Sequence, residues 1–261
     1  MTIQLSIIIP FLNSHELVRR QFLYWHRIGI PGPDTEILVM DDGSDPPIES
    51  VVSWPWSGAV RIIPTNDFRP WTSSLARNTA AKLAHGEYLF MTDGDYILTR
   101  EAVDKARNFR GDRLGCKRRF GVIDENGEFK TDDKTLIEWG IQPSRIKAKG
   151  NRLPTHPNNF VMRATLFQEM GGYREDLILG RGYPQKEDTY FKRKLMKMVF
   201  AGQITLTNED RPIIYMFPNG QYCGDVDANP FNMFHTLTRK TPENHWYTHQ
   251  RYPKDPVCEP V

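Results

Sequence analysis

Residues 5–13 read Leu-Ser-Ile-Ile-Ile-Pro-Phe-Leu-Asn, and this stretch decides the fold class. Its apolar run from Leu5 to Ile9 is rich in isoleucine and is bounded by Pro10. A short continuous run of this kind is typical of a strand buried on both faces, as in a parallel sheet covered by helices. The sequence therefore predicts that these residues form a central strand of an α/β domain.

A helix is predicted directly after this strand. Asn13 offers a helix N-cap, and Glu16 three residues later completes a capping box. An apolar stripe follows at helical spacing, formed by Val18, Phe22 and Trp25. Gly29 and the cluster Pro31-Gly32-Pro33 predict the end of this helix.

The rest of the first half continues the alternation of strand and helix. Apolar runs predict strands over 36–40, 60–63 and 88–91, and small apolar residues at helical spacing predict a helix over 71–84. Strands that alternate with helices need crossover connections, which favour a mainly parallel central sheet flanked by helices. Ligands of such sheets bind at the carboxyl ends of the strands.

The second half is less regular. The turn signal Asp124-Glu125-Asn126-Gly127 predicts a hairpin over 115–130, and the polar, basic segment 134–154 is predicted to be a loop or lid. A short strand over 159–162 and helices over 165–170 and 186–200 follow from the apolar spacing.

Composition excludes several protein classes. Lys and Arg number 34 against 32 Asp and Glu, a net charge of +2, which gives no general attraction to nucleic acid or anionic membranes. Cys116, Cys223 and Cys258 form neither a zinc motif nor a disulfide framework. No apolar run is long enough for a transmembrane segment, and the N-terminal residues lack the pattern of a signal peptide. We therefore expect a soluble, cytoplasmic protein, with peripheral membrane association left open.

Two acidic clusters follow predicted strands. Asp41-Asp42 ends the strand over 36–40, and Asp93-Gly94-Asp95 follows the strand over 88–91. Asp-Gly pairs alone commonly build turns. Two clusters at equivalent ends of one parallel sheet instead favour a ligand site, because adjacent carboxylates need a cation or hydrogen-bond donors to offset their repulsion.

Four elements in order resemble the family 2 glycosyltransferases: the run over 5–13, Asp41-Asp42-Gly43-Ser44, Ala76-Arg77-Asn78 and Asp93-Gly94-Asp95. Segments 158–163 and 170–176 are similar to the acceptor side of these enzymes. The stretch over 180–188 looks like a glycine-rich segment ending in Glu-Asp that galactosyltransferase C-terminal regions also contain. The resemblance implies a GT-A fold in one domain over 1–261, with a nucleotide-sugar-binding half over 1–110, an acceptor half over 111–240 and a tail over 241–261.

The resemblance also implies a reaction and its residues. A hexosyltransferase-like enzyme would move a sugar, with inversion, from a nucleoside diphosphate-sugar to a hydroxyl acceptor; a UDP-sugar is favoured over a GDP-sugar. Asp188 would be the catalytic base, with Glu187 beside it. A divalent metal, Mn²⁺ or Mg²⁺, would bind Asp95 and Asp93, with His235 as a candidate further ligand. The residues implied to bind the donor nucleotide are Pro10, Phe11, Asn13, Asp41, Asp42, Arg77, Asp93 and Gly94.

The sequence also departs from the family pattern and leaves alternatives open. Leu12 stands where many relatives have an aromatic residue that stacks on the base, a part that Phe11 would take. Lys147, Lys149, Arg152 and His156 form either a solvated loop, which we favour, or a contact for an anionic acceptor. Acceptors that fit are a glycan, a lipid-linked sugar or nucleic acid. The rival functions are a nucleotidyltransferase and a non-catalytic nucleotide-sugar-binding protein.

Overall fold

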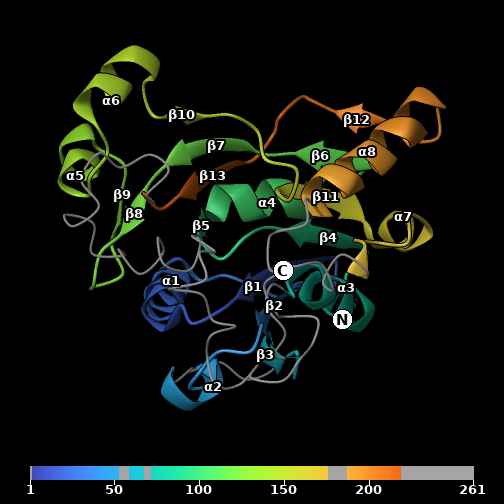
Figure 1. The fold of residues 1–261 in the computed structure, drawn as a ribbon, viewed down its shortest axis with the longest axis horizontal. Coiled ribbons are helices and arrows are strands. Elements are labelled where there is room, and N and C mark those ends of the chain that lie inside the picture. The colour runs from blue at the N-terminus through green and yellow to red at the C-terminus, as the bar shows by residue number, and fades with distance from the viewer. Residues whose placement is uncertain (1, 53–58, 68–71, 176–186, 219–261) are drawn as a thin grey trace, which may run out of the picture.

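The stretch over 5–13 forms the central strand β1 (Leu5–Phe11) of a seven-stranded sheet. The structure is a computed structural model that describes residues 2–52, 59–67, 72–175 and 187–218 (Figure 1). The strand order is β12-β6-β11-β4-β1-β2-β3. The other strands of this sheet are β2 (Thr35–Asp41), β3 (Val60–Pro64), β4 (Tyr88–Met91), β6 (Arg113–Gly115), β11 (Phe160–Arg163) and β12 (Leu206–Thr207).

The large sheet is mainly parallel. β1 runs parallel to both β2 and β4, and β2 runs parallel to β3. β11 is antiparallel to its neighbours β4 and β6, and β12 is again parallel to β6. The predicted α/β fold class with a mainly parallel sheet is therefore confirmed, with β11 as the reversed strand.

Helices cover both faces of this sheet, as Figure 1 shows. The helices are α1 (His15–Ile28), α2 (Ile48–Val51), α3 (Ser73–Leu83), α4 (Arg100–Asn108), α7 (Ala164–Glu169) and α8 (Glu187–Phe200), with α5 (Asp133–Glu138) and α6 (Pro143–Lys149) farther from the sheet. Ile7 and Ile9 of β1 join one apolar core with α1 and α4, whereas Ile8 joins a second core with α3, α7 and α8. This alternation explains why the apolar run of β1 is continuous, because both of its faces are buried.

A second, four-stranded sheet packs beside the first. Its order is β10-β7-β13-β5, formed by β10 (Arg152–Leu153), β7 (Lys117–Phe120), β13 (Ile213–Met216) and β5 (Tyr96–Leu98). A hairpin of β8 (Val122–Ile123) and β9 (Phe129–Lys130) surrounds the Asp-Glu-Asn-Gly turn. The predicted hairpin is thus confirmed only for its inner part, because β6 and β7 belong to the two larger sheets.

Two local predictions are wrong. Asn13 does not cap α1: the N-cap position is Ser14, and Glu16 pairs with Arg19 and Arg20 instead of completing a capping box. The physical reason is that the Asn13 side-chain oxygen accepts the Asp45 backbone N–H at 2.7 Å. It therefore stabilises the loop after β2 instead of the start of α1.

The segment over 134–154, predicted to be a loop, contains most of α5, all of α6 and β10. Each helix is shorter than two turns and buries one apolar side chain, which is Leu136 in α5 and Ile146 in α6. Such short helices leave no helical period to detect. Local signals start them instead: the Asp132 side chain accepts the Thr135 backbone N–H, and Pro143 lies in the first turn of α6. No helix within the described residues is long and apolar enough to cross a membrane.

Candidate active site

The loops that follow β1 and β2 are tied together by Asn13 and Asp41. The Asp41 carboxylate accepts the backbone N–H groups of Ser44 and Ile48, both at 2.8 Å. The Asn13 backbone N–H donates to the Ser44 hydroxyl at 2.9 Å. Asp41 is buried, and both of its carboxylate oxygens accept backbone donors, so it fixes the shape of this loop.

Asp42 presents a different environment one residue later. Its side chain is buried, and the Thr72 hydroxyl donates to it at 2.5 Å. Burial raises the pKa of Asp42 to about 7, although the Thr72 hydrogen bond and the positive charge of Arg77 oppose the increase. This carboxyl group therefore changes charge near neutral pH.

The substitution Asp42→Asn is expected to alter stability in a pH-dependent way. The folded protein keeps a proton on Asp42 up to a pKa of about 7, whereas the ordinary value is 3.8. Stability of the parent protein therefore falls as pH rises between these values, and the loss is complete above the folded pKa. Relative to the parent, Asp42→Asn should gain roughly 2–3 kcal/mol of unfolding free energy between pH 5 and pH 8. Chemical denaturation at both pH values measures this, and a constant difference would contradict the assigned burial.

Arg77, Asp93 and His156 form a cluster at the carboxyl end of β4. Arg77 is 3% exposed, and its guanidinium donates a hydrogen bond to the Asp93 carboxylate. The same guanidinium lies over the Tyr173 ring, 5.4 Å from the ring centre. On the other side, His156 Nδ1 lies 3.5 Å from Asp93 Oδ2. Asp93 is thus contacted by cationic or titratable groups from both α3 and the loop before β11.

The imidazole of His156 has a lowered pKa. Burial is the main cause, while the negative charges of Asp93 and Asp188 oppose the shift. The His156 ring nitrogen Nδ1 also accepts the Asn158 backbone N–H at 3.3 Å. Both observations favour a neutral imidazole next to the acidic cluster at neutral pH.

Glu187 and Asp188 begin α8 and point to different neighbours. Glu187 is 5% exposed, and its carboxylate accepts the Ser73 hydroxyl of α3 at 3.3 Å. Asp188 is only partly buried, and its Oδ1 accepts the Thr189 backbone N–H at 2.6 Å. The negative charge of Asp188, the less buried of the two carboxylates, acts on the imidazole of His156.

Gly94 packs against the end of β1. A Cβ atom added to Gly94 would lie 2.6 Å from Phe11 Cδ1 and 2.9 Å from the Pro10 carbonyl oxygen, so this position requires glycine. The Phe11 ring is 3% exposed and belongs to the apolar core. Asp95 is partly exposed, and its backbone carbonyl accepts the Phe217 N–H at 2.9 Å. This hydrogen bond joins the segment Asp93-Gly94-Asp95 to the residue that follows β13.

Four of the predicted site residues belong to one network of contacts and charge interactions. Arg77 and His156 both contact Asp93, Glu187 interacts electrostatically with Arg77, and Asp188 interacts electrostatically with His156. His156 was expected to lie in a solvated loop, and only its position in a basic segment hinted at a site. His235 and the glycine-rich stretch over 180–186 lie outside the described residues. Among the residues that the structure describes, no three His, Cys, Asp or Glu side chains are grouped to hold a metal ion.

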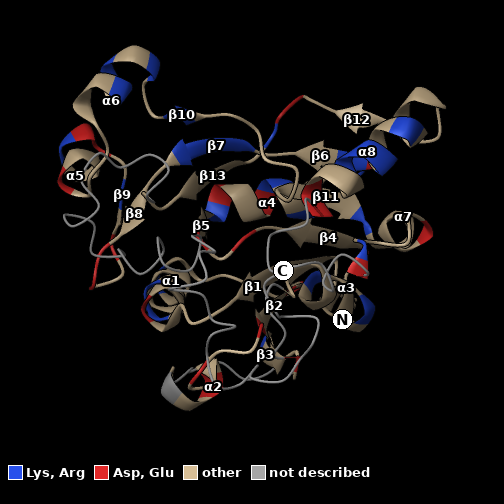
Figure 2. Ribbon diagram, viewed as in Figure 1, with Lys and Arg blue, Asp and Glu red and all other residues tan. Residues whose placement is uncertain are grey.

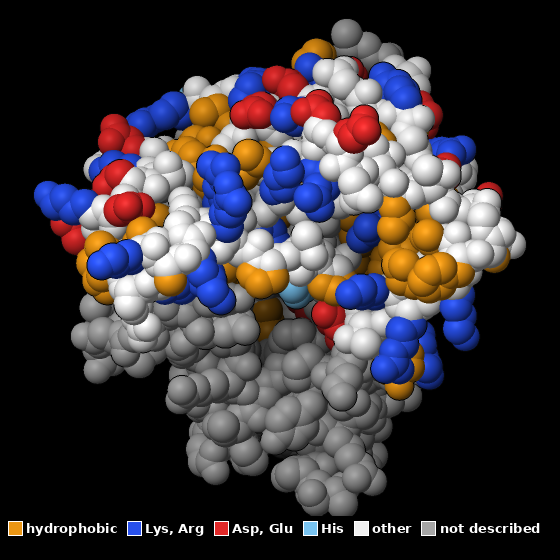
Figure 3. All heavy atoms as spheres, turned by 90° about the horizontal axis from the view of Figure 1, so that it is seen from above, with side chains coloured by type: hydrophobic (Ala, Val, Ile, Leu, Met, Phe, Trp, Pro, Cys, Tyr) orange, Lys and Arg blue, Asp and Glu red, His pale blue; other side chains and the backbone are white. Residues whose placement is uncertain are grey.

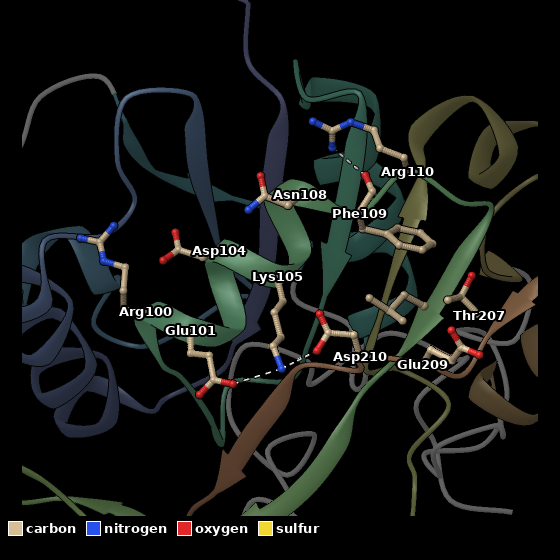
Figure 4. Close-up of a pocket in the computed structure, with 11 residues that line it drawn as sticks. Arg100, Glu101, Asp104, Lys105, Asn108, Phe109, Arg110, Thr207, Glu209 and Asp210 are labelled. Carbon is tan, nitrogen blue, oxygen red and sulfur yellow. Dashed lines mark hydrogen bonds and ion pairs between the residues drawn. The ribbon is translucent and has the colours of Figure 1, made fainter.

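Two cavities lined by described residues lie on either side of β6 and β12, and both include Thr207. A cavity of about 580 Å³ between α4 and the β6–β12 edge contains none of the clustered residues. There the Lys105 ammonium bridges Glu101 and Asp210, at 3.1 and 2.7 Å (Figure 4). A second cavity of about 190 Å³ is lined by His156 and by residues of α8. Figure 3 shows a hollow in which a histidine lies next to acidic side chains, with Lys and Arg side chains around it.

Comparisons with known proteins agree with this architecture. The family model described as glycosyl transferase family 2 matches residues 6–171, which is more than half of the chain. A relative is the poly(ribitol-phosphate) beta-N-acetylglucosaminyltransferase TarP of Staphylococcus aureus (strain N315), 25% identical over 138 residues, which are 52% of this chain and 42% of that protein. The chain therefore spans less than half the length of the curated relative it matches.

The chain is also similar to solved structures, and one of them has a TM-score above 0.5. The mannosyltransferase PcManGT from Pyrobaculum calidifontis, solved with GDP-Man and Mn²⁺, has a TM-score of 0.51 and 14% identity, over 84% of this chain and 58% of that chain. S. aureus TarS 1–349, solved with UDP, has a TM-score of 0.49 and 16% identity, over 96% of this chain and 74% of that chain. The family match and the shared architecture lead to one conclusion: the chain belongs to glycosyl transferase family 2 and has the GT-A fold.

Proposed function

We propose that the protein transfers a sugar from a nucleoside diphosphate-sugar to a hydroxyl acceptor, at the cluster around Asp93 and Asp188. The observation that carries this proposal is the convergence of Asp93, Arg77, His156 and Asp188 from four separate segments at the carboxyl end of β4. Ligands of α/β sheets bind at this end of the strands. Family membership supplies the reaction class.

In the proposed mechanism, Asp188 is the general base. Its carboxylate takes the proton of the acceptor hydroxyl as that oxygen forms a bond with the anomeric carbon, while the bond to the diphosphate breaks. The side chain is suited to this role because it is partly exposed, whereas Glu187 is buried against Ser73. A single displacement of this kind inverts the configuration at the anomeric carbon.

Arg77 is proposed to position Asp93 rather than to bind the phosphates alone. Its guanidinium is buried between the Asp93 carboxylate and the Tyr173 ring, so its orientation is fixed before a donor arrives. We propose that Asp42 contacts the nucleoside, with Asp41 and Asn13 holding its loop. In this proposal, Asp42 contacts the nucleotide, whereas Asp41 and Asn13 support the loop that contains it.

A divalent metal, Mn²⁺ or Mg²⁺, fits Asp95 together with Asp93. Both side chains are partly exposed at one loop, and hard cations at phosphate sites are commonly held by one or two carboxylates plus phosphate oxygens. When bound, the ion would neutralise the charge that develops on the leaving diphosphate. A buried cluster of three protein ligands is not required for this arrangement.

A nucleotide-binding screen tests the donor class. Thermal shifts should be measured with UDP, GDP, UTP and GTP, each with Mn²⁺, Mg²⁺ or a chelator. We expect the largest stabilisation with UDP and a metal, because a ligand that binds only the folded state raises the melting temperature. A preference for GDP would indicate that the donor is a GDP-sugar rather than a UDP-sugar. Binding of triphosphates with no response to either diphosphate would favour a nucleotidyltransferase and contradict the proposal.

A further inference from the structure

The cavity of about 190 Å³ lies between β6 and α8, close to the candidate active site. Arg113 of β6 and Lys192 of α8 line it from opposite sides, and the loops over 155–159 and 206–211 supply His156 and Arg211. Small-molecule pockets usually measure about 300–1,000 Å³. This cavity is therefore suited to a single small group rather than to a whole nucleotide-sugar.

The charged side chains that line this cavity are all cationic. Arg113, Lys192 and Arg211 line it, and none of its lining residues is Asp or Glu. The larger cavity shown in Figure 4 is a contrast on the same molecule, because its cations are matched by Glu101, Asp104, Glu209 and Asp210. Figure 2 shows that Lys and Arg also recur along β7 and α8. An excess of fixed cations in a concave site attracts anions.

The cations of this cavity lack carboxylate partners within the described residues. The Arg113 guanidinium lies 4.7 Å from the Phe160 ring centre and reaches one carbonyl, that of Pro157, at 3.5 Å. The Nε atoms of both Arg113 and Arg211 are buried without a hydrogen-bond acceptor. Burial lowers the pKa of Arg113, as expected for a cation that no nearby anion compensates. A bound anion would satisfy these donors.

The same cavity adjoins the proposed base. Lys192 follows Asp188 by four residues on α8, so the two side chains lie on the same face of the helix, one turn apart. His156 lines the cavity and also lies 3.5 Å from Asp93. A molecule that places an anionic group in the cavity would therefore lie within about one helical turn of Asp188.

We propose that the cavity lined by Arg113, Lys192 and Arg211 binds a phosphate group of the acceptor, which makes the acceptor a phosphate-bearing molecule with a free hydroxyl group. This inference rests on the proposed function. Arginine guanidinium groups match phosphate oxygens through paired, charge-assisted hydrogen bonds, and lysine adds a point charge. The donor diphosphate is the other source of phosphate in this enzyme, and the experiment separates the two.

The test is calorimetric titration of the full chain with inorganic phosphate, with and without saturating UDP and Mn²⁺. We expect phosphate to bind in both cases, because the acceptor phosphate and the donor diphosphate occupy separate places. Arg211→Gln and Lys192→Gln should each weaken phosphate binding about tenfold, a loss in the range for one charged hydrogen bond. Lys197→Gln is the matched control, since Lys197 is exposed on the same helix and does not line the cavity.

The outcomes separate this inference from the proposed function. If UDP binds but phosphate does not, the acceptor pocket is contradicted. The same holds if UDP displaces bound phosphate. Neither result contradicts sugar transfer. Phosphate that binds in a protein with no affinity for UDP contradicts sugar transfer instead. Equal phosphate affinity in the parent, Arg211→Gln and Lys192→Gln also overturns the pocket. In turnover, Lys192→Gln should raise the KM for a phosphorylated polyol about tenfold and leave the KM for the donor unchanged.

Discussion

The substitution Asp188→Asn is expected to lower sugar transfer by roughly a hundredfold or more, the usual contribution of a general base. Donor affinity should stay within a few-fold of the parent value. Asparagine keeps the Oδ1 atom that accepts the Thr189 backbone N–H, so the first turn of α8 should remain intact. It cannot take a proton from the acceptor hydroxyl. Turnover and UDP titration of the purified variant measure the two quantities separately.

Glu187→Gln is the matched control for this prediction. Adjacent residues of a helix point about 100° apart, so only one of the two carboxylates can face the reacting hydroxyl. Glu187 is buried, accepts the Ser73 hydroxyl and interacts electrostatically with Arg77, which favours a supporting role. We expect Glu187→Gln to change melting temperature more than turnover. Loss of transfer in Glu187→Gln with full activity in Asp188→Asn would show that the base is the neighbouring residue.

The second large effect is expected for Asp95→Ala. Without this carboxylate the metal would lose a ligand, so UDP affinity in the presence of Mn²⁺ should fall by about tenfold or more. The fold should persist, because Asp95 is partly exposed and its hydrogen bond to Phe217 uses the backbone carbonyl. Calorimetry of UDP binding with Mn²⁺ and with a chelator measures the change.

Asp133→Ala serves as the control for the loss of one negative charge, since Asp133 is exposed on α5. The parent and this control should both bind UDP more tightly with metal than with chelator. Equal affinity of the parent in the two conditions would contradict the proposed metal bridge. Asp93 is less suited to this test, because its carboxylate also compensates the buried Arg77 guanidinium.

The sequence predicted well those parts of the fold that rest on continuous apolar runs. The strands over 5–9 and 88–91 lie side by side in the core of the sheet, where burial on both faces leaves a strong pattern. The strand over 36–40 pairs in parallel with the other side of β1, so the acidic clusters that follow it and the strand over 88–91 lie at the same edge of the sheet. The same reasoning cannot detect the short helices over 134–154, because one starts at the Asp132 cap, the other at Pro143, and each buries few side chains.

Polar contacts between residues far apart in the sequence are the second kind of feature that could not be predicted from the sequence. The Asn13 side chain bonds to the Asp45 backbone N–H, and His156 reaches Asp93, because strands distant in sequence end side by side. A pattern over neighbouring residues contains no information about such pairs. The cation-lined cavity is equally invisible in sequence, since its residues come from β6, α8 and two loops. Each of these features can be recognised only in the folded structure, where the strands and loops that supply its residues lie together.

The most direct test of the central claim is the release of nucleoside diphosphate from a panel of nucleotide-sugars by the parent protein and by Asp188→Asn. With Mn²⁺ and a mixture of phosphorylated polyols as acceptors, we expect the parent to release UDP from at least one UDP-sugar. Asp188→Asn should release it at least about a hundredfold more slowly. No release of UDP or GDP from any donor by the parent, or equal rates for the two proteins, would contradict sugar transfer with Asp188 as the base.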